Sequence, residues 1–196
     1  MRCLLPALLA VSPAIALACP TEADLERGIL LTYASGDTEL ITRQRPDVLA
    51  MRYTATDGWQ SNLLVGKGVY TLQSVDLENG EPDHNTRINY AFPVAPTELP
   101  NPKAGLQFLQ TVIVSSSGDF EAETHAYSFA AIPAQTFGDC TYDAIEVKIA
   151  YQDQDNWVDT LVYFPALKLS YLAANEYDED SGRTLDVFEL VSLTTP

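Results

Sequence analysis

Ile145-Glu146-Val147-Lys148-Ile149-Ala150-Tyr151 is the stretch that decides the fold. Large apolar side chains occupy every second position, and Glu146 and Lys148 stand between them. A period of two places alternate side chains on opposite faces of a β-strand. The stretch therefore predicts a strand with one face in the core and the other in water, which is typical of antiparallel sheets.

The same alternation recurs along the chain after residue 28. Dipeptides suited to tight turns separate the runs, and short turns make neighbouring strands antiparallel. These dipeptides are Ser35-Gly36, Asp57-Gly58, Lys67-Gly68, Asn79-Gly80, Ser117-Gly118 and Ser181-Gly182. We predict eleven strands and a further one at the C-terminal end, near residues 28–34, 38–44, 48–55, 59–66, 69–77, 83–92, 105–115, 119–129, 142–152, 157–164, 167–176 and 183–193.

Helical periodicity is confined to residues 21–28, where Thr21 and Asp24 have the spacing of a capping box and Gly28 can end the helix. The predicted fold class is all-β: an antiparallel meander that forms an open or closed β-barrel with a short N-terminal helix. A two-sheet β-sandwich is the alternative. Four prolines in residues 93–105 predict an extended segment that crosses from one half of the sheet to the other.

Residues 1–18 have the pattern of a signal peptide: Met1-Arg2, an apolar run from Cys3 to Leu17, and small residues at Ala16 and Ala18. We therefore expect residues 19–196 to form a single all-β domain that is periplasmic or secreted. No later segment has the length and apolar character of a membrane span, so we expect no integral membrane segment after cleavage.

Cleavage after Ala18 leaves two cysteines, Cys19 and Cys140, which predicts one disulfide in an oxidising compartment. The alternative is an outer-membrane lipoprotein anchored through Cys19. Ala16 stands where lipoprotein leaders usually carry leucine, and lipidation would leave Cys140 as an odd thiol. Two free thiols are the third possibility.

The chain is strongly acidic, with 27 Asp and Glu residues against 11 Lys and Arg, a formal net charge of −16. Nucleic acid and anionic membrane surfaces are disfavoured partners, because binding them requires clustered Lys or Arg. The sequence contains no HExxH, GxSxG, P-loop or CxxC motif, so we predict no cofactor and no catalytic residue.

Two polar stretches have some features of metal sites. Glu121, Glu123 and His125 share one strand face, but we expect a solvated polar face there. Residues 175–183 are rich in acids, as a calcium loop is, but Ser181 replaces the turn glycine and Val187 the closing glutamate. We expect a charged hairpin tip at residues 178–180, and no metal site.

Aromatic residues at inward positions of several strands predict either plain core packing or a concave cavity for a ligand. A curled sheet of this size encloses more volume than a short helix can fill, which favours the cavity. The predicted ligand-binding residues are Tyr53, Tyr70, Tyr90, Phe108 and Tyr151.

The N-terminal cysteine with its short helix, the segment Cys140-Thr141-Tyr142 and residues 163–169 resemble uncharacterised exported proteins of Gram-negative bacteria. The overall pattern is similar to the open β-barrels of the LolA/LolB lipoprotein carriers, although the long helix that would plug a carrier's cavity is missing. The resemblance implies a shape and no catalytic residue.

We therefore expect a non-enzymatic periplasmic protein that binds a hydrophobic or amphiphilic ligand or an envelope partner. The alternatives are a secreted hydrolase that uses carboxylates such as Glu121 and Glu123, and a purely structural adaptor.

Overall fold

The computed structural model describes residues 18–152, 156–180 and 182–196. The predicted leader therefore lies outside the described residues except for Ala18. The described parts of the chain form fourteen strands: β1 (Ile29–Tyr33), β2 (Thr38–Arg45), β3 (Val48–Thr54), β4 (Gln60–Gly66), β5 (Tyr70–Glu78), β6 (Glu81–Pro82), β7 (Ile88–Ala91), β8 (Gln107–Ser116), β9 (Asp119–Phe137), β10 (Cys140–Tyr151), β11 (Val158–Phe164), β12 (Leu169–Glu179), β13 (Gly182–Val187) and β14 (Leu190–Thr194). Three 3-10 helices accompany them: η1 (Glu22–Glu26), η2 (His84–Thr86) and η3 (Pro96–Glu98).

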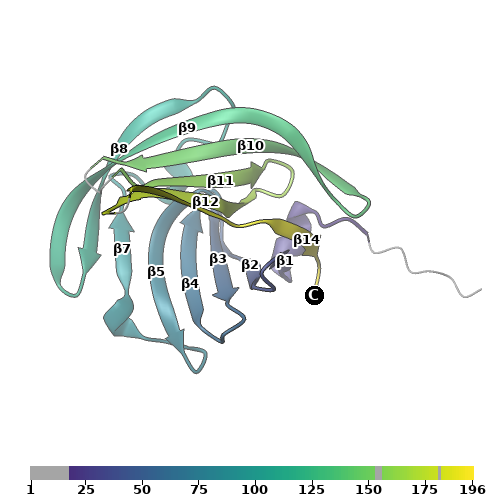
Figure 1. Ribbon diagram of the computed structural model, residues 1–196, viewed down its shortest axis with the longest axis horizontal. Helices are drawn as coiled ribbons and strands as arrows, with labels where there is room; N and C mark the ends of the chain where they lie inside the picture. Colours follow the sequence, from purple (N-terminus) through teal and green to yellow (C-terminus); the bar gives the residue numbers. More distant parts are fainter. Residues whose placement is uncertain (1–17, 153–155, 181) are drawn as a thin grey trace, which may run out of the picture.

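All strands belong to one antiparallel sheet, in the order β13-β12-β11-β10-β9-β8-β7-β5-β4-β3-β2-β1-β14, with β6 paired to β5. Figure 1 shows that β3–β5 form one wall of the barrel and that β9–β12 form the opposite wall. The prediction of an all-β meander curled into an open barrel is confirmed. The short N-terminal helix is the 3-10 helix η1, in which the Asp24 carboxylate accepts from Thr21 N at 2.9 Å and Thr21 Oγ1 at 2.8 Å.

The two edges of the sheet are bridged by the C-terminal segment. β13 pairs with β12 and β14 pairs with β1, although only two residues separate β13 from β14. Phe188 N donates to Ala173 O at 2.8 Å, and the next residue, Glu189, accepts from Ala34 N through its carbonyl oxygen at 2.8 Å. We call residues 187–190 the seam. The strand predicted at 183–193 is thus two strands, since its halves pair with opposite edges.

The two walls touch at the end of the barrel that carries the β4–β5 and β11–β12 turns. Gly68, with φ of +73°, lies so close to the Lys168 carbonyl that a Cβ atom would collide with it. Ser170 Oγ donates to Gly68 O at 2.6 Å. The two walls are therefore in direct contact at this end of the barrel.

The proline-rich segment also lies at this end, and the prediction that it crosses the sheet is wrong. It joins β7 to β8, which are direct neighbours. Leu99 is buried, and the Pro100 carbonyl accepts from Tyr70 OH at 2.8 Å. The prolines cannot extend a ladder, but their segment can pack across the barrel end and bury an apolar side chain there.

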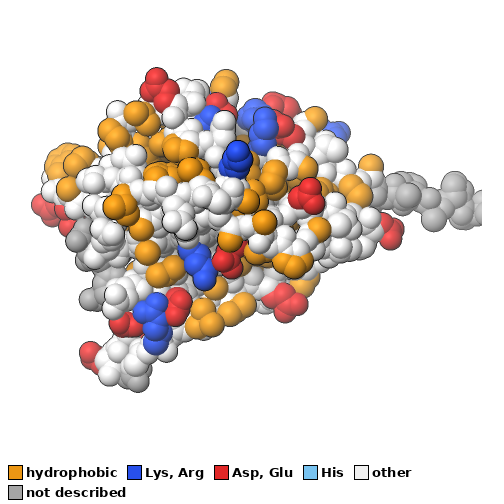
Figure 2. All heavy atoms as spheres, turned by 90° about the horizontal axis from the view of Figure 1, so that it is seen from above, with side chains coloured by type: hydrophobic (Ala, Val, Ile, Leu, Met, Phe, Trp, Pro, Cys, Tyr) orange, Lys and Arg blue, Asp and Glu red, His pale blue; other side chains and the backbone are white. Residues whose placement is uncertain are grey.

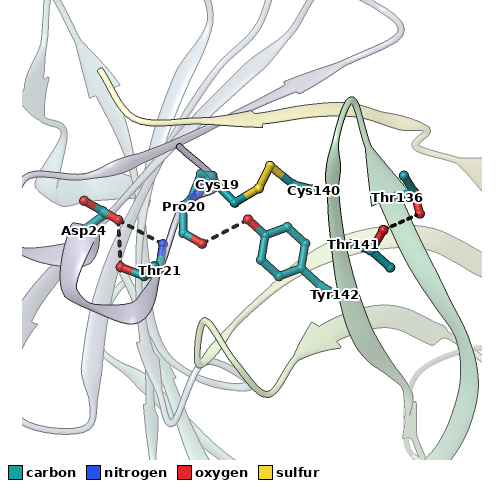
Figure 3. The surroundings of a disulfide bond; sticks show 8 residues. All are labelled: Cys19, Pro20, Thr21, Asp24, Thr136, Cys140, Thr141 and Tyr142. Atoms are coloured by element: carbon teal, nitrogen blue, oxygen red, sulfur yellow. Dashed lines mark hydrogen bonds between the residues drawn. A yellow bond between two sulfur atoms is a disulfide. The ribbon is translucent and has the colours of Figure 1, made fainter. Parts of the chain in front are cut away.

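The N-terminal segment is fixed to the tip of the β9–β10 hairpin by a disulfide between Cys19 and Cys140, as the sequence predicts (Figure 3). Beside it, Tyr142 OH donates to Pro20 O at 2.9 Å. β9 extends to Phe137, eight residues beyond its predicted end, because it continues into this hairpin. Conversely, the predicted strand at 83–92 is shortened to β7, since η2 occupies its first part.

Two clusters of buried side chains fill most of the interior. One lies between β1–β3 and β10–β12 and includes Leu31, Ile41 and Phe164; the other includes Tyr70 and Tyr127. On the outer surface, Figure 2 shows the few Lys and Arg side chains spread among acidic and hydrophobic ones. Two neighbouring cavities lie beside these clusters.

Candidate functional site: two cavities inside the barrel

The larger cavity, of about 350 Å³, lies beside the seam. Its walls come from both edges of the sheet: β1–β4 and their turns on one side, and β12 with the seam on the other. We call it the seam cavity. The first side contributes Tyr33, Asp37, Glu39, Tyr53, Trp59, Ser61 and Leu63, and the second contributes Leu172, Asn175 and Phe188.

Three aromatic rings form one corner of the seam cavity. The ring centroids of Tyr33 and Tyr53 are 6.4 Å apart, and those of Tyr53 and Trp59 are 5.8 Å apart. Tyr33 is buried, whereas Trp59 is 50% exposed. The corner therefore runs from the interior to the surface, with Trp59 at its mouth.

Two carboxyl groups face the same corner. Glu39 is buried, accepts a hydrogen bond from Tyr33 OH at 3.0 Å, and burial raises its pKa to about 7. Asp37 accepts from Tyr53 OH at 2.6 Å and from Thr56 N at 2.8 Å, and these hydrogen bonds lower its pKa to about 2. Asp37 is thus ionised at neutral pH, while Glu39 titrates near pH 7.

The smaller cavity, of about 180 Å³, is adjacent, because Leu63 lines both cavities. We call it the histidine cavity. Its polar lining comes from β5, β7, β9, β10 and β11, namely Thr71, Ser74, Tyr90, His125, Tyr127, Tyr151 and Asp159.

A buried hydrogen-bond network surrounds His125. Its Nε2 lies 2.7 Å from Glu123 Oε1, and its Nδ1 lies 3.2 Å from Tyr127 OH. Burial lowers the pKa of His125, against the opposing effect of the Glu123 carboxylate, so the imidazole is neutral at pH 7. These partners are satisfied when Nε2 carries the proton and donates to Glu123, and Nδ1 accepts from Tyr127.

Asp159 anchors the other side of the histidine cavity. It accepts from Tyr151 OH and from Trp157 Nε1, both at 2.7 Å, and burial raises its pKa. When its amide is oriented to satisfy its neighbours, Asn175 also donates to Asp159 Oδ1 at 2.9 Å. Because Asn175 lines the seam cavity, it connects the two cavities.

The five residues predicted to bind a ligand fall into three places. Tyr53 lines the seam cavity, and Tyr90 and Tyr151 line the histidine cavity. Tyr70 and Phe108 pack against each other in the core, with ring centroids 6.2 Å apart. Three of the five predicted residues therefore line the two cavities, and the other two pack in the core.

The expected solvated face at Glu121, Glu123 and His125 is wrong for two of these residues. Glu123 and His125 are each 3% exposed, and only Glu121 lies at the surface. They point inward because they stand an even number of residues before Tyr127 and Phe129 on β9 and so lie on the same face of the strand. The two glutamates proposed for a hydrolase are thus not a matched pair, since one is solvated and the other contacts His125.

Four further lining residues are not predicted from the sequence: Tyr33, Glu39, Trp59 and Asp159. Glu39 carried a signal, because it precedes the inward Ile41 by two residues and so has inward parity. The acidic hairpin tip is as expected in the part of the chain that the structure describes: Asp178 is exposed and is held by Asn156 and Arg183. Ser181 lies outside that part. Within it, no group of three His, Cys, Asp or Glu residues is arranged to hold a metal ion.

The buried carboxyl of Glu39 predicts a specific dependence of stability on pH. Above pH 4.5 the unfolded chain releases this proton, while the folded protein keeps it up to about pH 7, so ionisation favours unfolding. Glu39→Gln removes this effect. We expect the variant to become more stable than the unaltered protein as pH rises from 4.5 to 8, by about 3 kcal/mol at pH 8.

Urea unfolding of both proteins at several pH values measures this difference. Both proteins contain His125 and Asp159, so the contributions of these two residues to the pH dependence of stability cancel in the difference. Glu121→Gln, at an exposed position, is the matched control and should show a constant difference. A constant difference for Glu39→Gln as well would contradict a raised pKa at Glu39.

No protein-family model matches the sequence, and no curated protein matches it. Among solved structures, the chain is similar to one described as the hypothetical lipoprotein YmcC from Escherichia coli K12. The two share 11% identity with a TM-score of 0.43, over 84% of this chain and 87% of that one. Similarity to the LolA/LolB carriers stays a prediction. In the described parts of the chain, no helix is long and apolar enough to cross a bilayer.

Proposed function

We propose that this protein is a non-enzymatic, periplasmic or secreted binding protein that holds a hydrophobic or amphiphilic small molecule inside its open barrel. The observation that carries the proposal is the seam cavity. Its volume of about 350 Å³ lies within the range of small-molecule sites, and its lining combines aromatic and aliphatic side chains with a few polar groups. An export route is supported by the disulfide, which is stable in oxidising compartments.

The position of the cavity also favours binding. At the far end of the barrel, Gly68 and Ser170 hold the two walls together. The seam, in contrast, joins the two sheet edges through a single segment, with Phe188 beside the cavity. We expect a ligand to enter on this side of the barrel, where the half-exposed Trp59 stands at the mouth of the cavity.

A neutral fluorescent probe, N-phenyl-1-naphthylamine, tests the proposal. We expect saturable binding to the folded protein, weakened at least tenfold in Leu172→Trp, because the larger side chain fills the cavity from the β12 wall. Leu109→Trp is the matched control, since Leu109 lies on β8 with 64% of its side chain exposed. Circular dichroism confirms folding of each variant. Absent saturation, or equal binding by the two variants, would refute the proposal.

The alternative of an envelope partner draws on another feature. Leu185 and Val187 on β13 are 61% and 68% exposed, on a strand that ends the described sheet. Strand edges of this kind can accept a strand from a second protein. Failure of the probe to bind would leave this alternative.

A further inference from the structure

We propose that the seam cavity selects a positively charged amphiphile, whose quaternary or primary ammonium group lies between the aromatic rings of Tyr33, Tyr53 and Trp59 and the carboxyl groups of Glu39 and Asp37. This inference rests on the proposed function and specifies the ligand's charge.

The aromatic corner has the composition of an ammonium-binding site. Tyr53 lies between Tyr33 and Trp59, and both neighbouring pairs are tilted, by 57° and 59°. Tilted neighbours present ring faces in different directions around one space. A cation within about 6 Å of a ring centroid is attracted by the negative face of the ring, most strongly by tryptophan.

Glu39 supplies a buried carboxyl that lacks a cation. The structure buries two glutamates; Glu123 contacts His125, whereas Glu39 is hydrogen-bonded, within the described residues, by the neutral hydroxyl of Tyr33 alone. An isolated buried carboxylate is unfavourable, and its raised pKa reflects this cost. A bound ammonium group would supply the missing opposite charge. Asp37, ionised nearer the mouth, adds to the attraction.

The lining of the seam cavity contains no Lys, Arg or His among the described residues. An anionic head group, such as a fatty-acid carboxylate, would meet two carboxyl groups and no compensating cation. Three basic side chains, Arg43, Lys67 and Lys168, line a different pocket. Arg43 is ion-paired to both Glu22 and Glu26, Lys67 to Asp47, and Lys168 to Glu22.

The cavity also accommodates the rest of such a molecule. Leu63 on β4, Leu172 on β12 and Phe188 in the seam form an apolar wall of the cavity. An alkyl chain against this wall gains from removal of apolar surface from water. Head group and chain are thus recognised by different parts of one cavity.

The test compares decyltrimethylammonium, decanoate and decanol, each displacing N-phenyl-1-naphthylamine at pH 8 and at concentrations below micelle formation. We expect the cation to bind at least tenfold more tightly than the anion of the same chain length. Glu39→Gln and Trp59→Leu should each weaken binding of the cation about tenfold while changing binding of decanol less than twofold. Glu121→Gln, an exposed carboxyl outside the cavity, is the matched control and should change neither.

The outcomes separate the inference from the proposed function. If decanoate binds as tightly as the cation, or if neither variant weakens the cation, the charge selection is refuted and ligand binding stands. If the fluorescent probe and all three ligands fail to bind, both are refuted. Trp59 is half exposed, so its variant gives a second test of the site that does not depend on Glu39.

Discussion

The double variant Cys19→Ser/Cys140→Ser should lose about 4 to 5 kcal/mol of unfolding free energy relative to the oxidised protein. The bond joins residues 121 positions apart, so it removes a large loop-closure entropy from the unfolded chain. For a domain of this size, the same loss corresponds to a melting temperature lower by about 10 to 20 °C. Chemical denaturation measures the change directly.

Reduced but otherwise unaltered protein is the matched control, and its stability should equal that of the double variant. Equal stability of the oxidised and reduced proteins would contradict a stabilising bond. Intact mass gives a second check, with no acyl chain on Cys19. A disulfide uses the Cys19 sulfur that a diacylglyceryl thioether would need, so bond and lipid anchor exclude one another on this residue.

Phe164→Ala should destabilise the protein by about 3 to 5 kcal/mol. Phe164 is fully buried, and its ring centroid lies 5.9 Å from that of Phe137, 5.8 Å from that of Tyr142 and 6.0 Å from that of Tyr171. These rings come from β9, β10 and β12. Phe164 itself lies on β11. Truncation therefore leaves a cavity that these four strands would have to shift to fill.

Phe120→Ala is the matched control, because Phe120 is 75% exposed and its loss should cost less than about 0.5 kcal/mol. Equal unfolding free energies for the two variants would contradict the packing at Phe164. The losses of unfolding free energy caused by Phe164→Ala and by removal of the disulfide should not add fully. Tyr142 packs on Phe164, and its hydroxyl also donates to the Pro20 carbonyl beside Cys19.

The strands were predictable because alternation and turn chemistry are local. Val147 and Ile149 are buried and Lys148 is exposed, as their parity requires. The same rule, applied consistently, would have placed Glu123 and Glu39 inside. The charges of Glu121 and Glu123 favour a solvated face, which is why the prediction for this strand face is wrong for Glu123 and His125.

The cavities were not predictable, because parity gives the face of a residue and not its distance from the opposite wall. Tyr70 and Tyr90 are both inward residues, yet Tyr70 meets the rings of Phe92 and Phe108 while Tyr90 borders empty space. The seam shows the same limit. Residues 183–193 have one strand pattern, and only the curvature of the whole sheet makes their halves pair with opposite edges.

The seam also has a consequence for the order in which the fold can form. β14 pairs with β1, so residues near 30 find partners near 194, about 160 residues further along the chain. Contacts this distant in sequence make folding slow, because loop-closure entropy is lost before the contact compensates for it. The outer edge of β1 must therefore stay unpaired until residues 190–194 have been synthesised, and the pairing of β1 with β14 can form only then.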